Sequence, residues 1–263
     1  MADNLKMKGL GITINQKLNK VDVLEKGISI FFPAYNEAEN VGNTIEKSLA
    51  VVKPLKCDYE IIIVDDGSRD GTSGIVANYT EKNPHVILIQ HEKNLGYGGA
   101  LQTGFKSCKY GLVFFSDCDR QFDLNELNDF IEKMAHDKKI DAVIGYRLKR
   151  ADPLMRRLNA FGWKLWGRIL FGLKVKDVDC AFKLFKREVI KNIEFESSGA
   201  LISTELLVKT NKMGYKVVQS GVHHYPRMAG QQTGAKLSVI MKAFYESFKL
   251  FGKIHQYKKK LNG

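Results

Sequence analysis

The alternation of short apolar runs with longer amphipathic runs, which begins at Ile28, constrains the fold of this chain more than any other feature. The apolar runs read ISIFF, YEIIIV, HVILIQ, GLVFFS and DAVIG, and their length and β-branched content predict buried strands. In the segments between them, apolar residues recur at three- and four-residue spacing, which predicts helices. Successive strand–helix units of this kind form a largely parallel sheet covered by helices.

The length of the chain indicates one domain. With 263 residues, 44% of them hydrophobic, it can bury one substantial core, and we expect a single α/β domain with a mostly parallel central sheet flanked by helices. Residues 28–145 are expected to form a Rossmann-like half. The second half predicts a helix around TELLVKTNKMG, a strand YKVVQSGV that helps to finish the sheet, and a final helix from about Ala235.

The ends of the chain lack a core pattern. We therefore predict a flexible N-terminal extension over residues 1–27 and a basic C-terminal tail over residues 251–263, around a folded domain spanning residues 28–250.

The charge balance narrows the range of partners. Lys and Arg outnumber Asp and Glu by 41 to 29, and the resulting net charge of +12 suits phosphorylated substrates, an anionic membrane surface or nucleic acid. The basic residues do not interleave with aromatic residues in a recognisable nucleic-acid motif, so no nucleic-acid partner is expected.

Cysteines and apolar segments bear on the compartment. Cys57, Cys108, Cys118 and Cys180 lack the paired spacing of a zinc site or a disulfide framework, which favours a reducing compartment. The start of the chain lacks the apolar core of a secretory signal, and no window approaches the ~20 apolar residues that span a bilayer. We expect a cytoplasmic protein whose contact with a membrane, if it has one, is peripheral.

Ligands of such sheets bind beyond the carboxyl ends of the strands, so the residues that follow each strand are the candidates for chemistry. The first strand exit reads PAYNEAEN, where a capped strand-to-helix turn explains Pro33 and Glu37 equally well. The second exit, VDDGSRDGT, places Asp65 and Asp66 together at the end of a buried run. Their repulsion is costly unless a cation, a ribose hydroxyl or a base N–H is present, so we favour a ligand role for this pair.

The third exit, HEKNLGYGGALQTGF, is rich in glycine but does not match a dinucleotide-binding loop. The first strand exit lacks the GxGxxG pattern, and these glycines begin a helix after the third strand instead. Two explanations remain open: close approach of the backbone to a diphosphate, or tight packing of the helix on the sheet.

The fourth exit, GLVFFSDCDRQFD, carries the most specific signal. Asp117 and Asp119 directly follow a buried strand, and in extended backbone residues i and i+2 point to the same side. Two carboxylates, with Gln121 continuing the series, supply the hard oxygen ligands that Mg²⁺ or Mn²⁺ prefers and leave positions open for diphosphate oxygens. Cys118 points away and needs no role. Together with the aspartate pair of the second exit, this predicts a metal–diphosphate site on the rim of the sheet.

In this order and spacing, PAYNEAEN, VDDGSRDGT, NLGYGGALQTGF and SDCDRQFD resemble the motifs of glycosyltransferase family 2 enzymes of the GT-A fold. The resemblance runs from Ile28 to about Leu250. Within the family, GYRLKRADPLMRR, DVDCAFKLFKRE and HHYPRMAGQQTGA make the chain similar to dolichyl-phosphate mannosyltransferases and polyprenyl-phosphate hexose synthases. The resemblance implies transfer of a hexose from a GDP- or UDP-sugar to a polyprenyl or dolichyl phosphate, with Mg²⁺ or Mn²⁺ as cofactor.

The resemblance also implies roles for individual residues, carried over by position. Donor binding would fall to Pro33, Tyr35, Glu37, Asp65, Asp66, Asp117 and Arg227. Metal binding would fall to Asp117, Asp119 and Gln121, and acceptor binding to Arg147, Arg156 and Arg157. The catalytic set would comprise Asp117, Asp119, Arg147 and Asp179.

Two positions depart from the family pattern. Ala160 or Phe161 stands where the mannosyltransferases carry a serine about one helical turn after the acceptor arginines, and this departure bears on the identity of the acceptor. Arg120 replaces the glycine that is usual in the metal loop and adds positive charge beside the metal.

The expected reaction is an inverting displacement at the anomeric carbon. A sugar hydroxyl acceptor needs a general base, whereas a phosphate monoester, with a second pKa of about 6, is already a nucleophile at pH 7. Hydroxyl-directed members of the family carry an Asp in a Glu-Asp pair on a late helix, and here residues 203–206 read STEL, with no Asp. We therefore hypothesise a phosphate acceptor, with Asp177 and Asp179 as fallback bases or as supports of the site.

Two alternative functions remain. A soluble family 2 enzyme acting on a saccharide or protein hydroxyl predicts activity without lipid and dependence on an acidic side chain. A catalytically silent nucleotide-sugar binding module is disfavoured, because carboxylates at three strand exits have little reason to occur together without a cation.

The segment LMRRLNAFGWKLWGRILF predicts an amphipathic helix in which an apolar stripe runs beside a basic one, and Trp163 and Trp166 widen the apolar arc. Such a helix suits a membrane interface that presents a polyprenyl phosphate. The same stripe can instead face a protein core, and the sequence favours neither alternative over the other.

Overall fold

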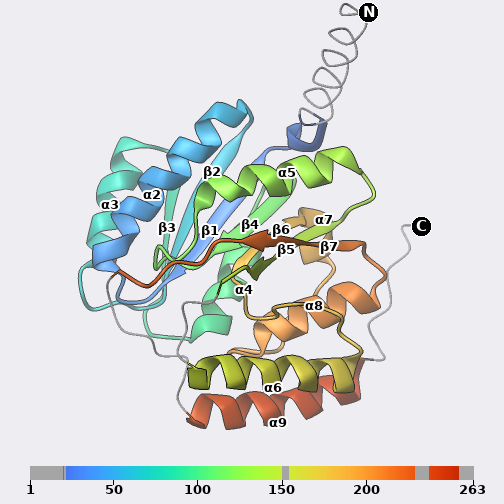
Figure 1. The fold of residues 1–263 in the computed structure, drawn as a ribbon. Coiled ribbons are helices and arrows are strands. Elements are labelled where there is room, and N and C mark those ends of the chain that lie inside the picture. The colour runs from blue at the N-terminus through green and yellow to red at the C-terminus, as the bar shows by residue number, and fades with distance from the viewer. Residues whose placement is uncertain (1–19, 21, 150–153, 229–236, 255–263) are drawn as a thin grey trace, which may run out of the picture.

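The computed structural model describes residues 20, 22–149, 154–228 and 237–254, and Figure 1 shows their arrangement. Within these residues the strands form a seven-stranded sheet in the order β3-β2-β1-β4-β6-β5-β7. The strands are β1 (Ile28–Ala34), β2 (Tyr59–Asp65), β3 (Val86–Gln90), β4 (Leu112–Ser116), β5 (Ala142–Arg147), β6 (Phe182–Lys186) and β7 (Val217–Val222). The helices are α2 (Ala38–Val52), α3 (Thr72–Lys82), α4 (Tyr97–Ser107), α5 (Leu127–His136), α6 (Leu154–Phe171), α7 (Arg187–Lys191), α8 (Ile202–Lys212) and α9 (Leu237–Lys253), with short 3-10 helices η1 (Lys53–Leu55) and η2 (Leu124–Glu126).

The pairing of the strands confirms the predicted mostly parallel sheet. β1 pairs in parallel with β2 on one side and β4 on the other, and β2 pairs in parallel with β3. The five apolar runs form β1 to β5, and YKVVQSGV contributes β7, parallel to β5. Because β1 lies between β2 and β4, the residues that follow these three strands lie close together at the carboxyl edge of the sheet.

One strand was not predicted from the apolar pattern. β6 lies between β4 and β5 and runs antiparallel to both. Its first residue, Phe182, pairs with Ser116, the last residue of β4. The residues just before β6 are therefore brought to the edge of the sheet where β4 ends.

The core is aromatic where α4 meets the sheet. Phe31 of β1 lies 5.0 Å from Phe105 of α4 and 5.5 Å from Phe115 of β4, measured between ring centroids. A Cβ atom on Gly104 would lie 2.2 Å from the ring of Phe31, and one on Gly98 would lie 2.4 Å from backbone of the loop after α7. Tight packing on the protein itself therefore accounts for these two glycines of the third exit segment.

The packed part of the chain extends slightly beyond the predicted domain boundaries at Ile28 and Leu250. Leu24 is buried and belongs to the core. At the other end, α9 continues to Lys253, and Ile254 is buried.

Helices α6 and α9 lie side by side at the bottom of Figure 1, away from α2 and α3. Trp163 and Trp166 of α6 both contact Phe244 of α9, at centroid distances of 5.2 and 5.3 Å, and the Trp166 indole donates a hydrogen bond to Ser247 Oγ (3.0 Å). The predicted amphipathic helix is present, and its two tryptophans pack against α9. None of the helices in the described part of the chain has the length and apolar character needed to cross a bilayer.

Replacing Gly104 with alanine is expected to destabilise the protein by about 1–3 kcal/mol, because the new methyl group would collide with the buried Phe31 ring. Urea unfolding measures this change. The matched control is Gly74→Ala in α3, where an added Cβ meets nothing within 4 Å and is expected to stabilise the fold by about 0.5 kcal/mol. Equal stabilities for the two variants would contradict the packing argument.

Candidate active site

The carboxyl edge of β1, β2 and β4 carries the carboxylates that the sequence singled out. Asp65 is the last residue of β2 and pairs in the register with Ala34 of β1. Glu37 follows β1, and Asp117 and Asp119 follow β4. Glu37, Asp65 and Asp119 are 8%, 0% and 7% exposed, so water solvates their charges poorly.

The loop after β4 turns at Arg120, whose φ of 63° lies in the left-handed region that favours glycine. This backbone conformation gives a physical reason for the glycine that the family pattern implies at this position. Cys118, which the sequence predicts to point away from the two aspartates, is buried in the core, and its carbonyl accepts a hydrogen bond from Thr44 Oγ1 (3.1 Å).

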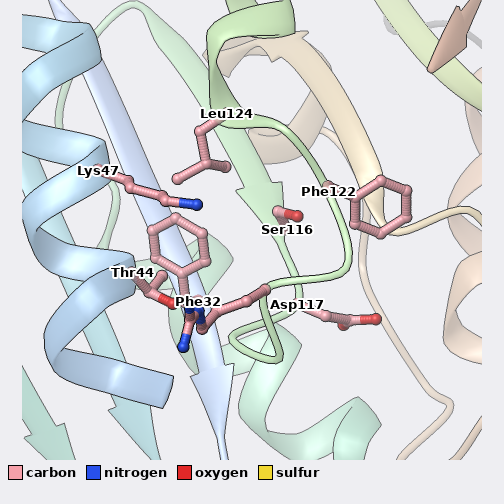
Figure 2. Close-up of a pocket in the computed structure, with 8 residues that line it drawn as sticks. Phe32, Thr44, Lys47, Ser116, Asp117, Phe122 and Leu124 are labelled. Atoms are coloured by element: carbon pink, nitrogen blue, oxygen red, sulfur yellow. The ribbon is translucent and has the colours of Figure 1, made fainter. Parts of the chain in front are cut away.

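A small pocket lies behind this loop and has room for about one water molecule, which is too little for a sugar or a nucleotide. Figure 2 shows that the Asp117 carboxylate extends away from Lys47 and Thr44, toward the opposite side of the loop. The pocket is lined by Phe32, Thr44, Lys47, Ser116, Asp117, Arg120, Phe122 and Leu124. A bound donor would therefore lie outside this pocket, on the side to which Asp117 points.

The surroundings of Asp117 disfavour its ionised form. Burial raises its pKa to about 7, and the negative charge of Asp119 adds to the increase. The hydroxyl of Tyr97, at the start of α4, donates a hydrogen bond to Asp117 Oδ1 (3.1 Å) and opposes the shift. Tyr97 is 36% exposed as a whole, but its hydroxyl is poorly solvated beside Asp117, and this desolvation, followed by the charge of Asp117, raises the pKa of Tyr97 well above its usual value. A cation at this place would favour the ionised form of both aspartates.

The C-terminal half reaches the metal loop through a short pairing. An isolated bridge joins Phe122 and His224. Gln121 Nε2 donates to the carbonyl of Tyr225 (2.9 Å), and the Tyr225 N–H donates back to the carbonyl of Gln121 (2.8 Å). This pairing leads the chain directly to Arg227.

Arg227 bridges two of the buried carboxylates. Its guanidinium forms an ion pair with Glu37, and its Nη1 lies 3.6 Å from Asp119 Oδ2. Burial raises the pKa of Glu37, and the hydrogen bond from Asn40 and the charge of Arg227 oppose the increase. The residue predicted to bind the donor diphosphate is therefore next to a predicted metal ligand.

The edge formed by the first two exits suits a nucleobase. Pro33 is buried within β1, while the ring of Tyr35 is 41% exposed. Asp65 Oδ1 accepts a hydrogen bond from the Ser68 N–H (3.0 Å), and Oδ2 is buried without a hydrogen-bond partner among the described residues. An unpaired buried carboxylate oxygen is costly, and a base N–H would satisfy it.

Asp66 lies on the same rim, but its carboxylate is used within the protein. Oδ1 is 2.7 Å from His91 Nδ1 and accepts from the Leu95 N–H (2.8 Å), and Oδ2 accepts from the Gly96 N–H (2.9 Å). His91 Nε2 lies 2.9 Å from Thr103 Oγ1. Asp66 thus holds the start of α4, and its predicted place in the donor site stays a prediction.

The turn before β6 is fixed by two buried cations. Arg147 makes a bidentate pair with Asp177, with Nε 2.7 Å from Oδ2 and Nη2 2.9 Å from Oδ1. Lys183 of β6 is fully buried and donates to the carbonyls of Val178 (3.2 Å) and Cys180, and burial lowers its pKa. The neighbouring Asp179 is exposed, and its charge acts on Tyr97.

Residues 203–206 lie at the start of α8, where Glu205 is fully buried. Its carboxylate accepts hydrogen bonds from the backbone N–H groups of Glu196 (2.9 Å) and Ser197 (2.8 Å), and Lys209 Nζ lies 2.6 Å from Oε1. Glu205 is therefore a structural anchor for the loop before α8.

The predicted acceptor residues Arg156 and Arg157, and the neighbouring Ala160 and Phe161, belong to the backbone of α6, but their side chains lie outside the described part of the structure.

Sequence reasoning missed two side chains that border the site. Tyr97 follows the third strand exit, so the search of strand exits could have found it, but the glycines around it drew attention to the backbone instead. Lys183 gave no usable signal, because a lysine in a short strand ordinarily predicts exposure.

The candidate metal ligands form a sparse set. The described residues contain no group of three or more His, Cys, Asp or Glu side chains placed to hold a metal. Two carboxylates and one amide, from Asp117, Asp119 and Gln121, nevertheless fit Mg²⁺ or Mn²⁺, since Mg²⁺ is commonly held by one or two protein carboxylates together with water and substrate phosphates. The raised pKa of Asp117 fits a cation at this place.

Comparison with known proteins identifies the family. The family model described as Glycosyl transferase family 2 matches residues 29–194, so the chain belongs to this family.

Two curated relatives illustrate the similarity. The chain is 32% identical over 183 residues to a dolichyl-phosphate beta-glucosyltransferase of Dictyostelium discoideum, and the match covers 63% of this chain and 56% of that protein. It is 27% identical over 218 residues to an undecaprenyl-phosphate 4-deoxy-4-formamido-L-arabinose transferase of Shewanella sediminis, and this match covers 81% of the chain and 63% of that protein. The chain thus spans less than two thirds of the length of either relative.

Among solved structures, the chain resembles glucosyl-3-phosphoglycerate synthase from Mycobacterium tuberculosis in complex with Mn²⁺, uridine diphosphate and phosphoglyceric acid. The TM-score is 0.67 at 18% identity, and the match covers 88% of this chain and 81% of that one. This likeness confirms the predicted GT-A fold.

Binding of Mn²⁺ is expected to weaken as the pH falls below 7. The pKa of Asp117 is about 7, so its carboxyl group is increasingly protonated below that pH and a cation must displace the proton. Calorimetric titration is expected to give about tenfold tighter binding at pH 8 than at pH 6. In Asp119→Asn, binding should be weaker and its pH dependence should move to lower pH, because the repulsion that raises the Asp117 pKa is removed. Equal affinity of the parent protein at both pH values would contradict the assignment.

Proposed function

We propose that this chain is an inverting glycosyltransferase that transfers a hexose from a GDP- or UDP-sugar to a polyprenyl phosphate, with Mg²⁺ or Mn²⁺ as cofactor. The observation that carries the proposal is the carboxylate set of Asp65, Asp117 and Asp119 at one edge of the sheet, in which Asp65 and Asp119 are buried and Asp117 is half-buried, with Arg227 beside it. Membership of glycosyl transferase family 2 supports glycosyl transfer. The names of the two curated relatives, which refer to dolichyl and undecaprenyl phosphate, support the lipid phosphate acceptor.

The donor nucleotide is expected along the rim from β2 to β4. The exposed ring of Tyr35 can stack on a base, and Asp65 Oδ2 can accept a hydrogen bond from a base N–H. Arg227 can turn from Glu37 and Asp119 to a diphosphate, which offers a bidentate match for its guanidinium. The uridine diphosphate bound in the structural neighbour supports a nucleotide diphosphate in this fold.

The metal would be held by Asp117, Asp119 and Gln121. When bound, a divalent cation neutralises negative charge on the leaving diphosphate. The chain itself buries Asp119, fixes it through the backbone N–H of Gln121 (3.1 Å), and supplies the positive charge of Arg227.

A phosphate acceptor agrees with the contacts of the acidic residues near the site, because two of them are bound to other groups of the protein. Glu205 is committed to Lys209 and to backbone N–H groups, and Asp177 is committed to Arg147. Both therefore serve as supports. The exposed Asp179 is the residue on which the alternative depends, because a saccharide or protein hydroxyl acceptor would need a base at the rim.

Transfer can be tested with radiolabelled GDP- and UDP-hexoses, Mg²⁺ or Mn²⁺, and a short-chain polyprenyl phosphate. We expect a metal-dependent lipid product from one donor, and a loss of at least about a hundredfold in Asp119→Ala, which removes charge from the metal site. Asp129→Ala, at an exposed position of α5, should match the parent. Donor hydrolysis without a lipid product would retain a transferase and reject the lipid acceptor, whereas neither turnover nor donor binding would favour a silent binding module.

The acceptor chemistry is tested in the same assay with Asp179→Asn. If the acceptor is a phosphate, turnover should stay within about threefold of the parent, because no base is needed. A fall of about a hundredfold or more, with donor binding intact, would identify Asp179 as a base and favour the hydroxyl acceptor.

The pair of helices α6 and α9 offers a surface for lipid. It exposes large apolar side chains together with two cations, Arg168 of α6 and Lys249 of α9. The apolar set comprises Leu165 and Ile169 of α6 with Tyr245, Phe248 and Phe251 of α9. Exposed apolar area combined with cations suits the surface of an anionic membrane. We infer that this α6/α9 face attaches the protein peripherally to the cytoplasmic side of a membrane, and the free state of all four cysteines agrees with a reducing compartment.

Attachment can be tested by sedimentation with vesicles of phosphatidylcholine and phosphatidylserine. Lys249→Glu should weaken binding at least about fivefold, because a cation near an anionic surface contributes roughly 1 kcal/mol. Lys53→Glu, an exposed position in η1 outside the α6/α9 face, changes the net charge equally and should have a smaller effect. Equal losses in the two variants would mean that net charge alone attracts the protein and would reject this face.

A further inference from the structure

The contact between Tyr97 and Asp117 joins the third and fourth strand exits, which no feature of the sequence connects. The Tyr97 hydroxyl donates to Asp117 Oδ1 at 3.1 Å. Asp117 follows β4, whereas Tyr97 is the first residue of α4, after β3. The hydrogen bond occupies one carboxylate oxygen and leaves Oδ2 available to a ligand. Because the charge of Asp119 repels the Asp117 carboxylate, a fixed donor on one side limits how far that group can rotate away.

The backbone that carries Tyr97 is held from the side of β2. Asp66 accepts hydrogen bonds from the backbone N–H groups of Leu95 and Gly96, the two residues before Tyr97. Asp66 is itself bound to His91, whose other ring nitrogen contacts Thr103 within α4. The side chains of Asp66 and His91 are 4% and 10% exposed, so both groups are held in a poorly solvated network.

The opposite side of the same helical turn is held by the loop before α8. Gly98 packs so closely on Ser198 that a Cβ atom would lie 2.4 Å from its carbonyl carbon. Gln102 Nε2 donates to the carbonyl of Ser197 (3.0 Å), and the buried Glu205 accepts from the N–H of Ser197. The start of α4 is therefore confined between two buried anchors, and both hold the backbone from which the Tyr97 side chain extends to Asp117.

We infer that Tyr97 is a positioning residue for Asp117 and that the Asp66–His91 pair positions Tyr97, so that the second and third strand exits together set the geometry of the metal site. The inference rests on the proposed function of Asp117 and Asp119. It gives Asp66 a role in positioning a metal-site residue, in addition to its place on the rim.

The test is the affinity for Mn²⁺ alone, measured by calorimetry at pH 8.5 on the full chain. Tyr97→Phe removes only the hydroxyl and is expected to weaken Mn²⁺ binding about tenfold, while the thermal midpoint stays within about 2 °C of the parent. The matched control is Tyr79→Phe, which removes a hydroxyl that donates to Glu46 Oε1 (2.8 Å) between α3 and α2, and it should leave Mn²⁺ affinity unchanged. An unchanged affinity in Tyr97→Phe would overturn the inference.

The role of His91 is tested with two amide substitutions. The amide nitrogen of Asn can take the place of Nδ1 and keep the bond to Asp66, whereas that of Gln takes the place of Nε2 and gives up that bond. His91→Asn should therefore retain Mn²⁺ affinity and His91→Gln should lose about fivefold. In the Tyr97→Phe background, His91→Gln should add no more than about a twofold further loss, because both changes act through one contact. Equal effects of the two amides, or fully additive losses, would overturn the role of the pair.

Asp119→Ala separates failure of this inference from failure of the proposed function. If the parent binds no Mn²⁺, or binds it equally well in Asp119→Ala, the metal site itself is rejected and this inference falls with it. If binding depends on Asp119 but not on Tyr97, the metal site stands and only the positioning role is lost.

Discussion

Burying like charges at one edge of a sheet raises the free energy of the folded state, and much of the site can be understood as a response to that constraint. Asp117 and Asp119 lie on one short loop, and burial together with their mutual repulsion raises the pKa of Asp117 to about 7. Arg227 brings a positive charge to Asp119, the Tyr97 hydroxyl bonds to Asp117, and the buried Lys183 adds a favourable charge from β6. These groups offset the repulsion only in part, since the Asp117 pKa stays high. The remaining imbalance is what a divalent cation would relieve.

The elements predicted from sequence are those whose pattern is local. The runs that form β1 to β5 are apolar because their strands are buried, and their carboxylates could be placed together because parallel strands present their carboxyl ends at one edge. β6 escaped prediction because its sequence, FKLFK, is short and has a lysine at its second position, where a charged residue ordinarily predicts exposure. That lysine, Lys183, is instead buried and donates to two backbone carbonyls, which only the tertiary structure brings to it.

The same limit explains which parts of the site could not be predicted. The sequence singled out both Arg147 and Asp177, but it could not predict their ion pair. That pair forms because β6 lies antiparallel beside β4 and places the residues before β6 near the end of the sheet. The partner of the Tyr97 hydroxyl lies on a different strand exit, and no spacing rule connects the two. For α6, the sequence of an apolar stripe with two tryptophans is the same whether the stripe contacts a membrane or another helix. In the structure the two tryptophans pack against α9, whereas Ile169 of α6 is 70% exposed.

The ion pair between Glu37 and Arg227 joins residues that are 190 positions apart, and this separation has a consequence for biosynthesis. The first half of the sheet, with its carboxylates, leaves the ribosome long before Arg227 is made, and contacts of such long range form late because of the cost of closing the intervening chain. During that interval the carboxylates of the rim lack the positive charge of Arg227. Of the charged groups described at this rim, Arg227 is therefore the last to be synthesised, and the electrostatic balance of the site is complete only when nearly the whole folded part of the chain has been made.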